Sequence, residues 1–289
     1  MVTVIITTCL RPPELVVRSI TSVVNQTYKD LEIIVVDDSP QSYEYRMDVY
    51  NSIVGIKDTR IKYLFNSENI GACASRNRAI KCSLGDYIIY VDDDDELVKD
   101  CIEKRLEKMN ESNAGLIYSD SYIVDEETKK MHMSNQPKYR GMVFDELIKS
   151  NFIEAFPLIK RECFLECGLF DVEMQAAQDY EMWLRIALKF SVDYVNEPLA
   201  IIHLHKGERI SKNPQKKIQG LERISNIYKE YLDRNPSAKY IRTMKMIPYY
   251  TAIGNKKKAR ELYLQAVKIY PFRILTNAKY LKQLIRYSF

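Results

Sequence analysis

The chain has 289 residues, of which 46% are hydrophobic and 28% are charged, and its formal net charge is +4. This composition predicts a globular protein with a sizeable core, and the length is typical of about two domains. No apolar run approaches the roughly 18 residues of a membrane span, and the apolar start at residues 1–8 lacks the basic leader and cleavage site of a signal peptide. The six cysteines form no CxxC pair and no cluster with histidine, which argues against a zinc site or a disulfide framework and favours a reducing cytoplasm.

The first hundred residues alternate between short β-branched runs and helical stretches. Strands are predicted at 2–6, 31–36, 61–65 and 87–91, and helices at 12–25, within 39–51 and at 72–83. Strands separated by helices predict a parallel sheet with right-handed crossovers. No GxGxxG and no Walker lysine motif occurs, so neither a dinucleotide dehydrogenase nor a P-loop enzyme is favoured.

Two of these strands end in acidic residues. The apolar run 87–91 leads directly into Asp92, Asp93, Asp94 and Asp95, and the strand at 31–36 is followed by two further aspartates. In open α/β sheets, ligands bind outside the carboxyl ends of the strands. Four adjacent carboxylates repel each other, and a hard divalent cation that shares its coordination with substrate phosphates is the natural counter-ion. The alternative is a solvated acidic turn after a strand.

The rest of the chain is more mixed and ends in a basic helical region. Helices are predicted at 97–112, 144–149, 164–167 and 179–190, and strands at 115–118, 192–195 and 199–204, with strands and loop across 121–141. Residues 1–211 carry 25 Lys and Arg against 35 Asp and Glu, whereas residues 212–289 carry 18 against four. A tetratricopeptide-like hairpin is matched by the spacing of Gly254, Ala259, Tyr263, Ala266 and Pro271. Because a repeat array needs about three such units, we interpret this hairpin as a helical cap.

Several motifs in order resemble family 2 glycosyltransferases of the GT-A fold across residues 1–211. They are the opening strand 2–8 with Arg11, the helix end Gln26-Thr27-Tyr28, the acidic strand 32–39, Asn69-x-Gly71 with Ser75-Arg76-Asn77, the DxD-like strand 90–95, and 168–171 followed by 178–185. The resemblance implies an α/β fold with a mostly parallel sheet flanked by helices. It also implies a nucleotide-sugar half at 1–100 and an acceptor half at 101–211, and it leaves the helical extension at 212–289 outside.

The resemblance also implies roles for particular residues. Asp94 and His205 would hold Mn²⁺ or Mg²⁺ on the donor diphosphate, and Asp179 would be the general base that deprotonates the acceptor. The donor-binding residues that it implies are Thr7, Arg11, Asp37, Asp38, Arg76, Asp92 and Asp93.

Each of these roles has a structural alternative. A histidine such as His205 is often structural, Arg76 could form a surface salt bridge, and either Asp37–Asp38 or Asp179 could cap the helix that follows. Because side chains alternate along a strand, Asp93 and Asp95 are expected to face away from Asp92 and Asp94, although a turn could bring Asp95 in.

Three departures from the family pattern involve four residues. Cys9 and Leu10 stand where an aromatic residue and an asparagine are usual, Ser39 replaces a glycine, and Gln178 replaces a glutamate. The first change removes a stacking surface for the base, which leaves the nucleotide open.

The resemblance therefore predicts a metal-dependent, inverting hexosyl- or N-acetylhexosaminyltransferase. We expect a UDP-sugar donor and a saccharide or lipid-linked saccharide acceptor in bacterial surface polysaccharide synthesis. We also expect a cytoplasmic protein at the inner face of the membrane. Its basic tail 212–289, which from Tyr270 on carries apolar and aromatic residues among its lysines and arginines, would lie against anionic lipid. A nucleotidyltransferase and a non-catalytic scaffold on the helical tail are the alternatives, and no nucleic-acid partner is expected because no binding motif is present.

Overall fold

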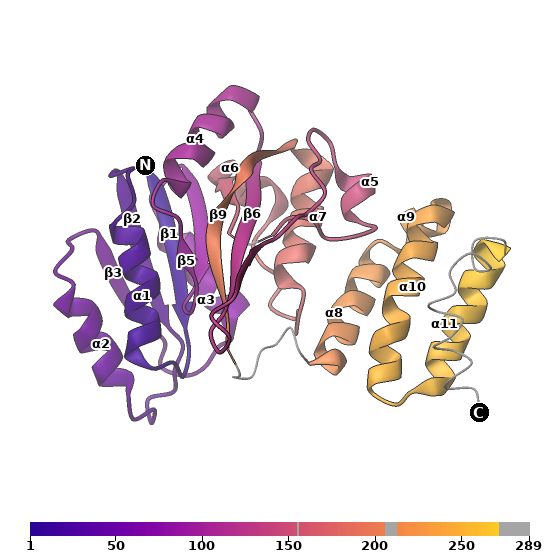
Figure 1. The fold of residues 1–289 in the computed structure, drawn as a ribbon, viewed down its shortest axis with the longest axis horizontal. Helices are drawn as coiled ribbons and strands as arrows, with labels where there is room; N and C mark the ends of the chain where they lie inside the picture. Colours follow the sequence, from indigo (N-terminus) through magenta and orange to yellow (C-terminus); the bar gives the residue numbers. More distant parts are fainter. Residues whose placement is uncertain (155, 206–212, 272–289) are drawn as a thin grey trace. The chain divides into compact units, whose positions relative to one another are not determined.

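The computed structural model of the chain describes residues 1–154, 156–205 and 213–271 (Figure 1). Its contacts divide the chain into two units. Unit 1 comprises Met1–Phe144, Phe152–Val172 and Met182–Lys206, and unit 2 comprises Asp145–Asn151, Glu173–Glu181 and Gly207–Phe289. Two short segments of the predicted glycosyltransferase-like region therefore belong to the same unit as the C-terminal helices.

Unit 1 is built on one mixed sheet. In the described residues its order is β3-β2-β1-β4-β8-β6-β9-β5, with β7 paired to β6. The strands are β1 Val2–Thr8, β2 Leu31–Asp37, β3 Ile61–Phe65, β4 Tyr87–Asp92, β5 Glu96–Leu97, β6 Leu116–Asp125, β7 Met131–Met133, β8 Leu158–Lys160 and β9 Val192–Leu204. The long pairings, among β1 to β4 and between β6 and β9, are parallel, and the short pairings to β5, β7 and β8 are antiparallel.

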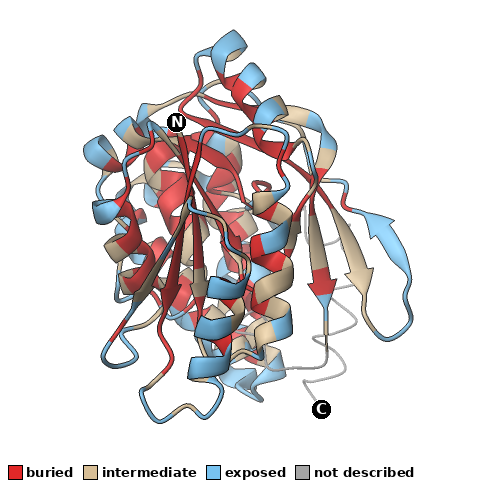
Figure 2. Cartoon of the chain, turned by 90° about the vertical axis from the view of Figure 1, so that its left-hand side faces the viewer, coloured by how far each residue is buried: buried red, intermediate tan, exposed pale blue. Residues whose placement is uncertain are grey.

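Helices pack on both faces of the central strands β1, β2 and β4, which explains why these strands are almost continuously apolar. The helices that start in the first 190 residues are α1 Pro13–Val24, α2 Arg46–Gly55, α3 Ala72–Cys82, α4 Cys101–Ser112, α5 Phe144–Leu147, α6 Arg161–Cys167 and α7 Gln178–Lys189. Alternate residues such as Val4, Ile6 and Ile89 pack with apolar residues of α1, α2 and α4 in one buried cluster. Tyr90 points to the opposite face, where it stacks on Trp183 of α7. The central strands are accordingly buried, whereas β7 at the periphery is exposed (Figure 2).

The strand order brings two acidic strand ends to one edge. β1 lies between β2 and β4, so the order of the sheet reverses at β1. Thr7 pairs with Asp92 of β4, and Thr8 pairs with Asp37 of β2. All three strands are parallel, so their carboxyl ends meet where an α/β sheet binds its ligands.

Three sequence predictions in this unit are wrong in their boundaries. The helix expected from residue 97 begins at Cys101, because Glu96–Leu97 pair with β9 as a strand. The strand expected at 115–118 continues to Asp125. The strands expected at 192–195 and 199–204 are one strand. Ser119 of β6 pairs with Val195 and the next residue, Asp120, pairs with Pro198, so residues 196 and 197 form an irregularity within the pairing and the strand continues past it.

The described part of unit 2 is helical, as predicted. Its C-terminal helices are α8 Pro214–Ile227, α9 Lys229–Arg234, α10 Pro236–Ala252 and α11 Lys256–Ile269. Asparagines 213, 235 and 255 each accept a hydrogen bond from a first-turn amide of the helix that follows. Gly254, with a φ of +75°, turns the chain between α10 and α11, and Ala259 and Ala266 are buried in the small core of these helices. In the described residues no helix is long and apolar enough to span a membrane.

Candidate active site

The four consecutive aspartates form a buried turn, and the solvated alternative is wrong for three of them. β4 ends at Asp92, whose side chain is half exposed, and the next three residues turn away from the strand. Asp93, Asp94 and Asp95 are all buried. The expectation that Asp93 and Asp95 face away as in a strand is wrong, because the strand ends at Asp92, and the alternative of a turn that brings Asp95 in is confirmed. Asp95 accepts a hydrogen bond from the backbone amide of His203 at 2.8 Å.

Side chains from two distant segments contact this turn. Arg11, in the loop after β1, donates to Asp93 at 3.0 Å and to Asp94 at 2.9 Å. His205 Nε2, just after β9, lies 2.7 Å from Asp94 Oδ2. Burial raises the pKa of Asp93 to about 6, although the neighbouring Arg11 guanidinium opposes this rise. The protein thus supplies a counter-charge of its own at Arg11, so repulsion between the carboxylates does not by itself require a metal ion.

The donor set nevertheless fits a divalent cation that shares its ligands with a substrate. In the part of the chain that the structure describes, no group of three or more His, Cys, Asp or Glu side chains forms a metal cage. Asp94 and His205 offer one carboxylate oxygen and one imidazole nitrogen next to each other. Mg²⁺ is commonly held by one or two carboxylates together with substrate phosphates and water. A two-residue site therefore suits a cation that arrives with a diphosphate.

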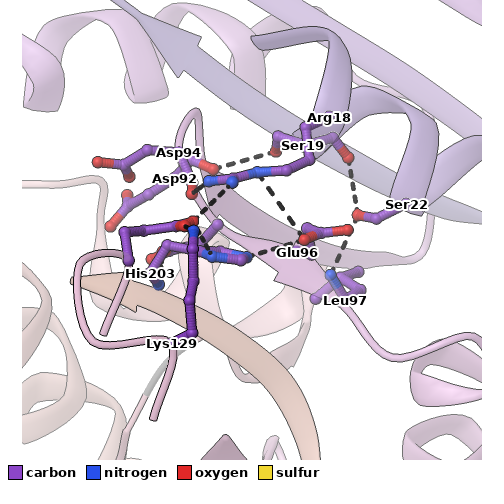
Figure 3. A network of polar contacts seen from close by, with 11 residues as sticks. Arg18, Ser19, Ser22, Asp92, Asp94, Glu96, Leu97, Lys129 and His203 are labelled. Atoms are coloured by element: carbon purple, nitrogen blue, oxygen red, sulfur yellow. Dashed lines mark hydrogen bonds and ion pairs between the residues drawn. The ribbon is translucent and has the colours of Figure 1, made fainter. Parts of the chain in front are cut away.

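A network of polar side chains that the sequence did not reveal contacts the backbone of the aspartate turn (Figure 3). Arg18 of α1 donates to the backbone carbonyl of Asp94 at 2.5 Å and to Glu126 at 2.9 Å. His203 lies 2.8 Å from Glu96 and 2.6 Å from Glu126. These side chains come from α1, β5, β9 and the end of β6, so only the folded sheet brings them together. The sequence around these four residues contains no motif that would predict the network, since each of them could equally be an ordinary surface residue.

The aspartates after β2 already have protein partners. Asp37 accepts from the hydroxyl of Tyr63 at 2.5 Å, and burial together with this carboxylate raises the pKa of Tyr63. Asp38 accepts from the backbone amides of Ile70 and Gly71, at 2.9 and 2.8 Å, and so fixes the loop that leads into α3. Capping of the next helix is wrong for both residues, because α2 has no side-chain cap. Contact with base and ribose stays a prediction.

Arg76 forms a salt bridge, as the structural alternative expected, but its own side chain is buried rather than on the surface. It projects from α3 and donates to Asp92 at 3.1 Å, with its guanidinium over the rings of Tyr90 and Phe170. Tyr90 in turn stacks on Trp183, with ring centroids 5.7 Å apart. Aromatic packing thereby holds Arg76 against the exposed carboxylate of the turn, and contact with donor phosphates stays a prediction.

Asp179 belongs to unit 2, as the second residue of α7. It is therefore inside the first turn rather than at the N-cap, where its charge is favourable toward the helix dipole. Its side chain is half-buried, and its role as general base stays a prediction. The basic segment 206–211 beside His205 and the tail 272–289 lie outside the described residues.

Comparison with known families decides the class of protein. A family model described as "Glycosyl transferase family 2" matches residues 3–168. The chain belongs to this family. A glycosyl transferase of Escherichia coli (strain K12), WcaA, whose name places it provisionally in colanic acid biosynthesis, is 32% identical to this glycosyltransferase over 78% of the chain and 81% of its own length. The scaffold and nucleotidyltransferase alternatives are set aside accordingly.

Other relatives and a solved structure agree. The "GalNAc(5)-diNAcBac-PP-undecaprenol beta-1,3-glucosyltransferase" of Campylobacter jejuni is 26% identical over 84% of this chain and 80% of that protein. An uncharacterised glycosyltransferase of Rickettsia conorii is 29% identical, but the chain spans only 34% of its length. The crystal structure of S. aureus TarS 1–349 in complex with UDP-GlcNAc superposes with a TM-score of 0.67 at 15% identity, covering 94% of this chain and 82% of that one. The predicted GT-A fold is confirmed.

Proposed function

We propose that this glycosyltransferase moves a hexosyl or N-acetylhexosaminyl group from a UDP-sugar, with Mn²⁺ or Mg²⁺ and with inversion at the anomeric carbon. The observation that carries the proposal is the Asp94–His205 pair at the carboxyl edge of the sheet, with Arg11 beside it. The S. aureus TarS structures, whose titles name UDP-GlcNAc and UDP, support the choice of donor at the level of a shared fold.

Four side chains and the proposed base have tasks in this proposal. Asp94 and His205 would hold the cation, which when bound stabilises negative charge on the departing diphosphate as a Lewis acid. Arg11 and Arg76 bind carboxylates of the aspartate turn, and their planar guanidinium groups match phosphate oxygens. Asp179 takes the proton of the acceptor hydroxyl as it attacks from the face opposite the leaving group.

The acceptor in this proposal is a saccharide, free or lipid-linked, in bacterial surface polysaccharide synthesis. Support comes from two relatives, one named for colanic acid biosynthesis and the other for glucosyl transfer to an undecaprenol-linked glycan. Both match more than three quarters of this chain, which includes the acceptor side as well as the donor side.

Calorimetric titration of UDP, GDP, dTDP and CMP, each with and without Mn²⁺, tests the donor site. We expect one nucleotide to bind in an Mn²⁺-dependent manner, and Asp94→Ala and His205→Ala to lose that dependence. Asp100→Ala is the matched control, because Asp100 pairs only with Lys104 on the surface among the described residues. Binding of no nucleotide to the folded protein, or equal binding without Mn²⁺, would contradict the proposed site.

An anionic membrane surface is the proposed partner of the C-terminal helices. α11 begins with Lys256, Lys257 and Lys258 and has no acidic residue in its first turn. Such a cluster is disfavoured by the helix dipole and attracts anionic headgroups. We expect vesicles that contain anionic lipid, and not neutral vesicles, to co-sediment the protein, and the double variant Lys256→Glu/Lys257→Glu to pellet less. Equal pelleting with both kinds of vesicle would remove the idea.

A further inference from the structure

The C-terminal helix α10 places one buried arginine against the segment that carries the proposed base. Arg242 is 7% exposed and has all three guanidinium nitrogens engaged. It donates to the carbonyl of Ile148, the hydroxyl of Tyr180, the carbonyl of Leu221 and the hydroxyl of Ser225, at 3.0–3.2 Å for the closest contact to each. Burial lowers the pKa of Arg242, and none of these acceptors carries a charge.

Burying a cation whose acceptors are all neutral costs free energy that an apolar contact between the same segments would not cost. Desolvation of an ion costs several kcal/mol, and well-packed apolar residues often serve stability as well or better. What the guanidinium adds is direction, since its five N–H groups leave one plane at fixed angles. Arg242 therefore fixes the orientation of what it binds, beyond holding it in contact.

Because Tyr180 follows Asp179 directly in α7, fixing the side chain of Tyr180 also restricts the backbone that carries Asp179. Its hydroxyl accepts from Arg242 and lies 2.8 Å from the carbonyl of Leu147 and 3.1 Å from that of Ile148. Burial raises the pKa of Tyr180 to about 12, so the phenol stays protonated and can donate. Three polar contacts therefore hold the hydroxyl end of the side chain, and the preceding residue is Asp179.

A second C-terminal helix reaches the same segment independently. Gly220 of α8 lies so close to Ala176 that a Cβ added there would be 2.2 Å from the Ala176 carbonyl oxygen. Ala177, the next residue, has a φ of +59°, a left-handed conformation that costs an L-residue energy. Strain of this kind persists only where the surrounding structure enforces it.

We propose that Arg242 and Gly220 are positioning residues for Asp179. The two contacts hold the segment at residue 176 and at residue 180, with Asp179 between them in the sequence, and all of these residues belong to unit 2. The C-terminal helices thereby act as part of the acceptor-activating machinery. This inference rests on the proposed function of Asp179 as general base, because a fixed orientation affects the rate only if the carboxylate takes part in the reaction. A displacement of about 1 Å at such a group can lower a rate by about a hundredfold.

The experiment compares Arg242→Gln and Gly220→Ala with wild type in the full-length protein. Arg234→Gln is the matched control, because its side chain is 83% exposed and its only ion pair in the described residues is to Glu230. We expect the two test variants to lower kcat about 10- to 100-fold with the donor KM unchanged, and the control to leave kcat as it is. Calorimetric affinity for UDP with Mn²⁺ should not change in any of them.

A double-mutant cycle separates positioning from a general loss of structure. If Arg242 acts through Asp179, Arg242→Gln should lower kcat in the wild-type background and have no further effect in Asp179→Asn. A fall of equal size in both backgrounds overturns the proposal, because it would show that Arg242 only supports the fold.

Hydrogen exchange gives a readout that does not depend on activity. We expect backbone amides of residues 173–181 to exchange at least about tenfold faster in Arg242→Gln and Gly220→Ala, with strands β1, β2 and β4 unchanged. Unchanged exchange at 173–181 overturns the positioning role. Faster exchange together with an Asp179→Asn variant of normal kcat would instead show that the base assignment is wrong, which separates the two failures.

Discussion

Replacing Arg11 with glutamine tests whether this arginine keeps the aspartate turn folded in place of a metal ion. The guanidinium binds Asp93 and Asp94 at 3.0 and 2.9 Å, and their side chains are only 7% and 9% exposed. Loss of a hydrogen bond to a charged group costs about 1.5–3 kcal/mol. Because Arg11 is itself 27% exposed, solvent screens part of the attraction, and we expect about 2 kcal/mol for both bonds together. A loss of this size lowers the melting temperature by about 4–8 °C in a chain this long.

The same variant should respond more strongly to Mn²⁺ than wild type does. Arg11 and a cation would both draw on the carboxylate of Asp94, so removal of the arginine leaves that carboxylate open to the cation. A ligand at a hundred times its Kd stabilises the folded state by about 2.7 kcal/mol. We therefore expect millimolar Mn²⁺ to restore most of the stability lost by Arg11→Gln and to change wild type little.

Thermal unfolding with and without Mn²⁺ measures both effects. Arg60→Gln is the control, because Arg60 forms a comparable ion pair with Asp58, at 2.6 Å, in the loop before β3 and away from the aspartate turn. If Arg11→Gln and Arg60→Gln lose equal stability, the ion pairs of Arg11 contribute no more than an ordinary surface ion pair, and the arginine does not hold the aspartate turn. If Mn²⁺ stabilises wild type more than Arg11→Gln, arginine and cation do not compete, and Asp94 is not the shared ligand.

Three further changes have expected outcomes. Burial favours protonation of Glu32, but three hydrogen bonds to its carboxylate outweigh that effect and lower its pKa. The stability that the carboxylate contributes is therefore present above about pH 4.3 and is lost as the pH falls through the lowered pKa. Glu32→Gln should lose about 1–3 kcal/mol of unfolding free energy in urea at pH 7, and this loss should shrink in acid. His203→Ala leaves Glu96 and Glu126 without the imidazole between them, and we expect about tenfold weaker Mn²⁺-dependent nucleotide binding by calorimetry, with unchanged binding refuting a supporting role. Gly71→Ala meets no side chain but must keep a φ of +87°, so a melting curve should show a loss of about 1–2 kcal/mol, and no loss would mean that the loop adapts.

The sequence was most informative where one physical cause dominated. Short apolar runs predicted β1, β2 and β4, and the aspartates that end two of them predicted the edge at which they meet, because a parallel sheet buried on both faces leaves little other choice. The prediction was weakest around β9, because pattern reasoning reads Glu197–Pro198 as a break, whereas a local irregularity in the pairing with β6 carries the strand through. Charge repulsion in the turn favoured a metal ion, but it could not foresee that Arg11 would return from the β1 loop to neutralise two of the carboxylates.

The C-terminal helices show a different limit of sequence reasoning. Their basic composition predicted a separate extension with its own partner, whereas in the structure they form one unit with residues 145–151 and 173–181. The family model ends at residue 168, before α7, so the aspartates and arginines of the proposed donor site fall inside the matched region, whereas Asp179 and His205 fall beyond it. Close backbone contact at Gly220 and a guanidinium fork at Arg242 are not visible as motifs, since either residue alone is unremarkable in a helix. If the positioning proposal holds, a C-terminal region taken from another family member should preserve nucleotide binding and impair transfer, unless residues 173–181 are exchanged with it.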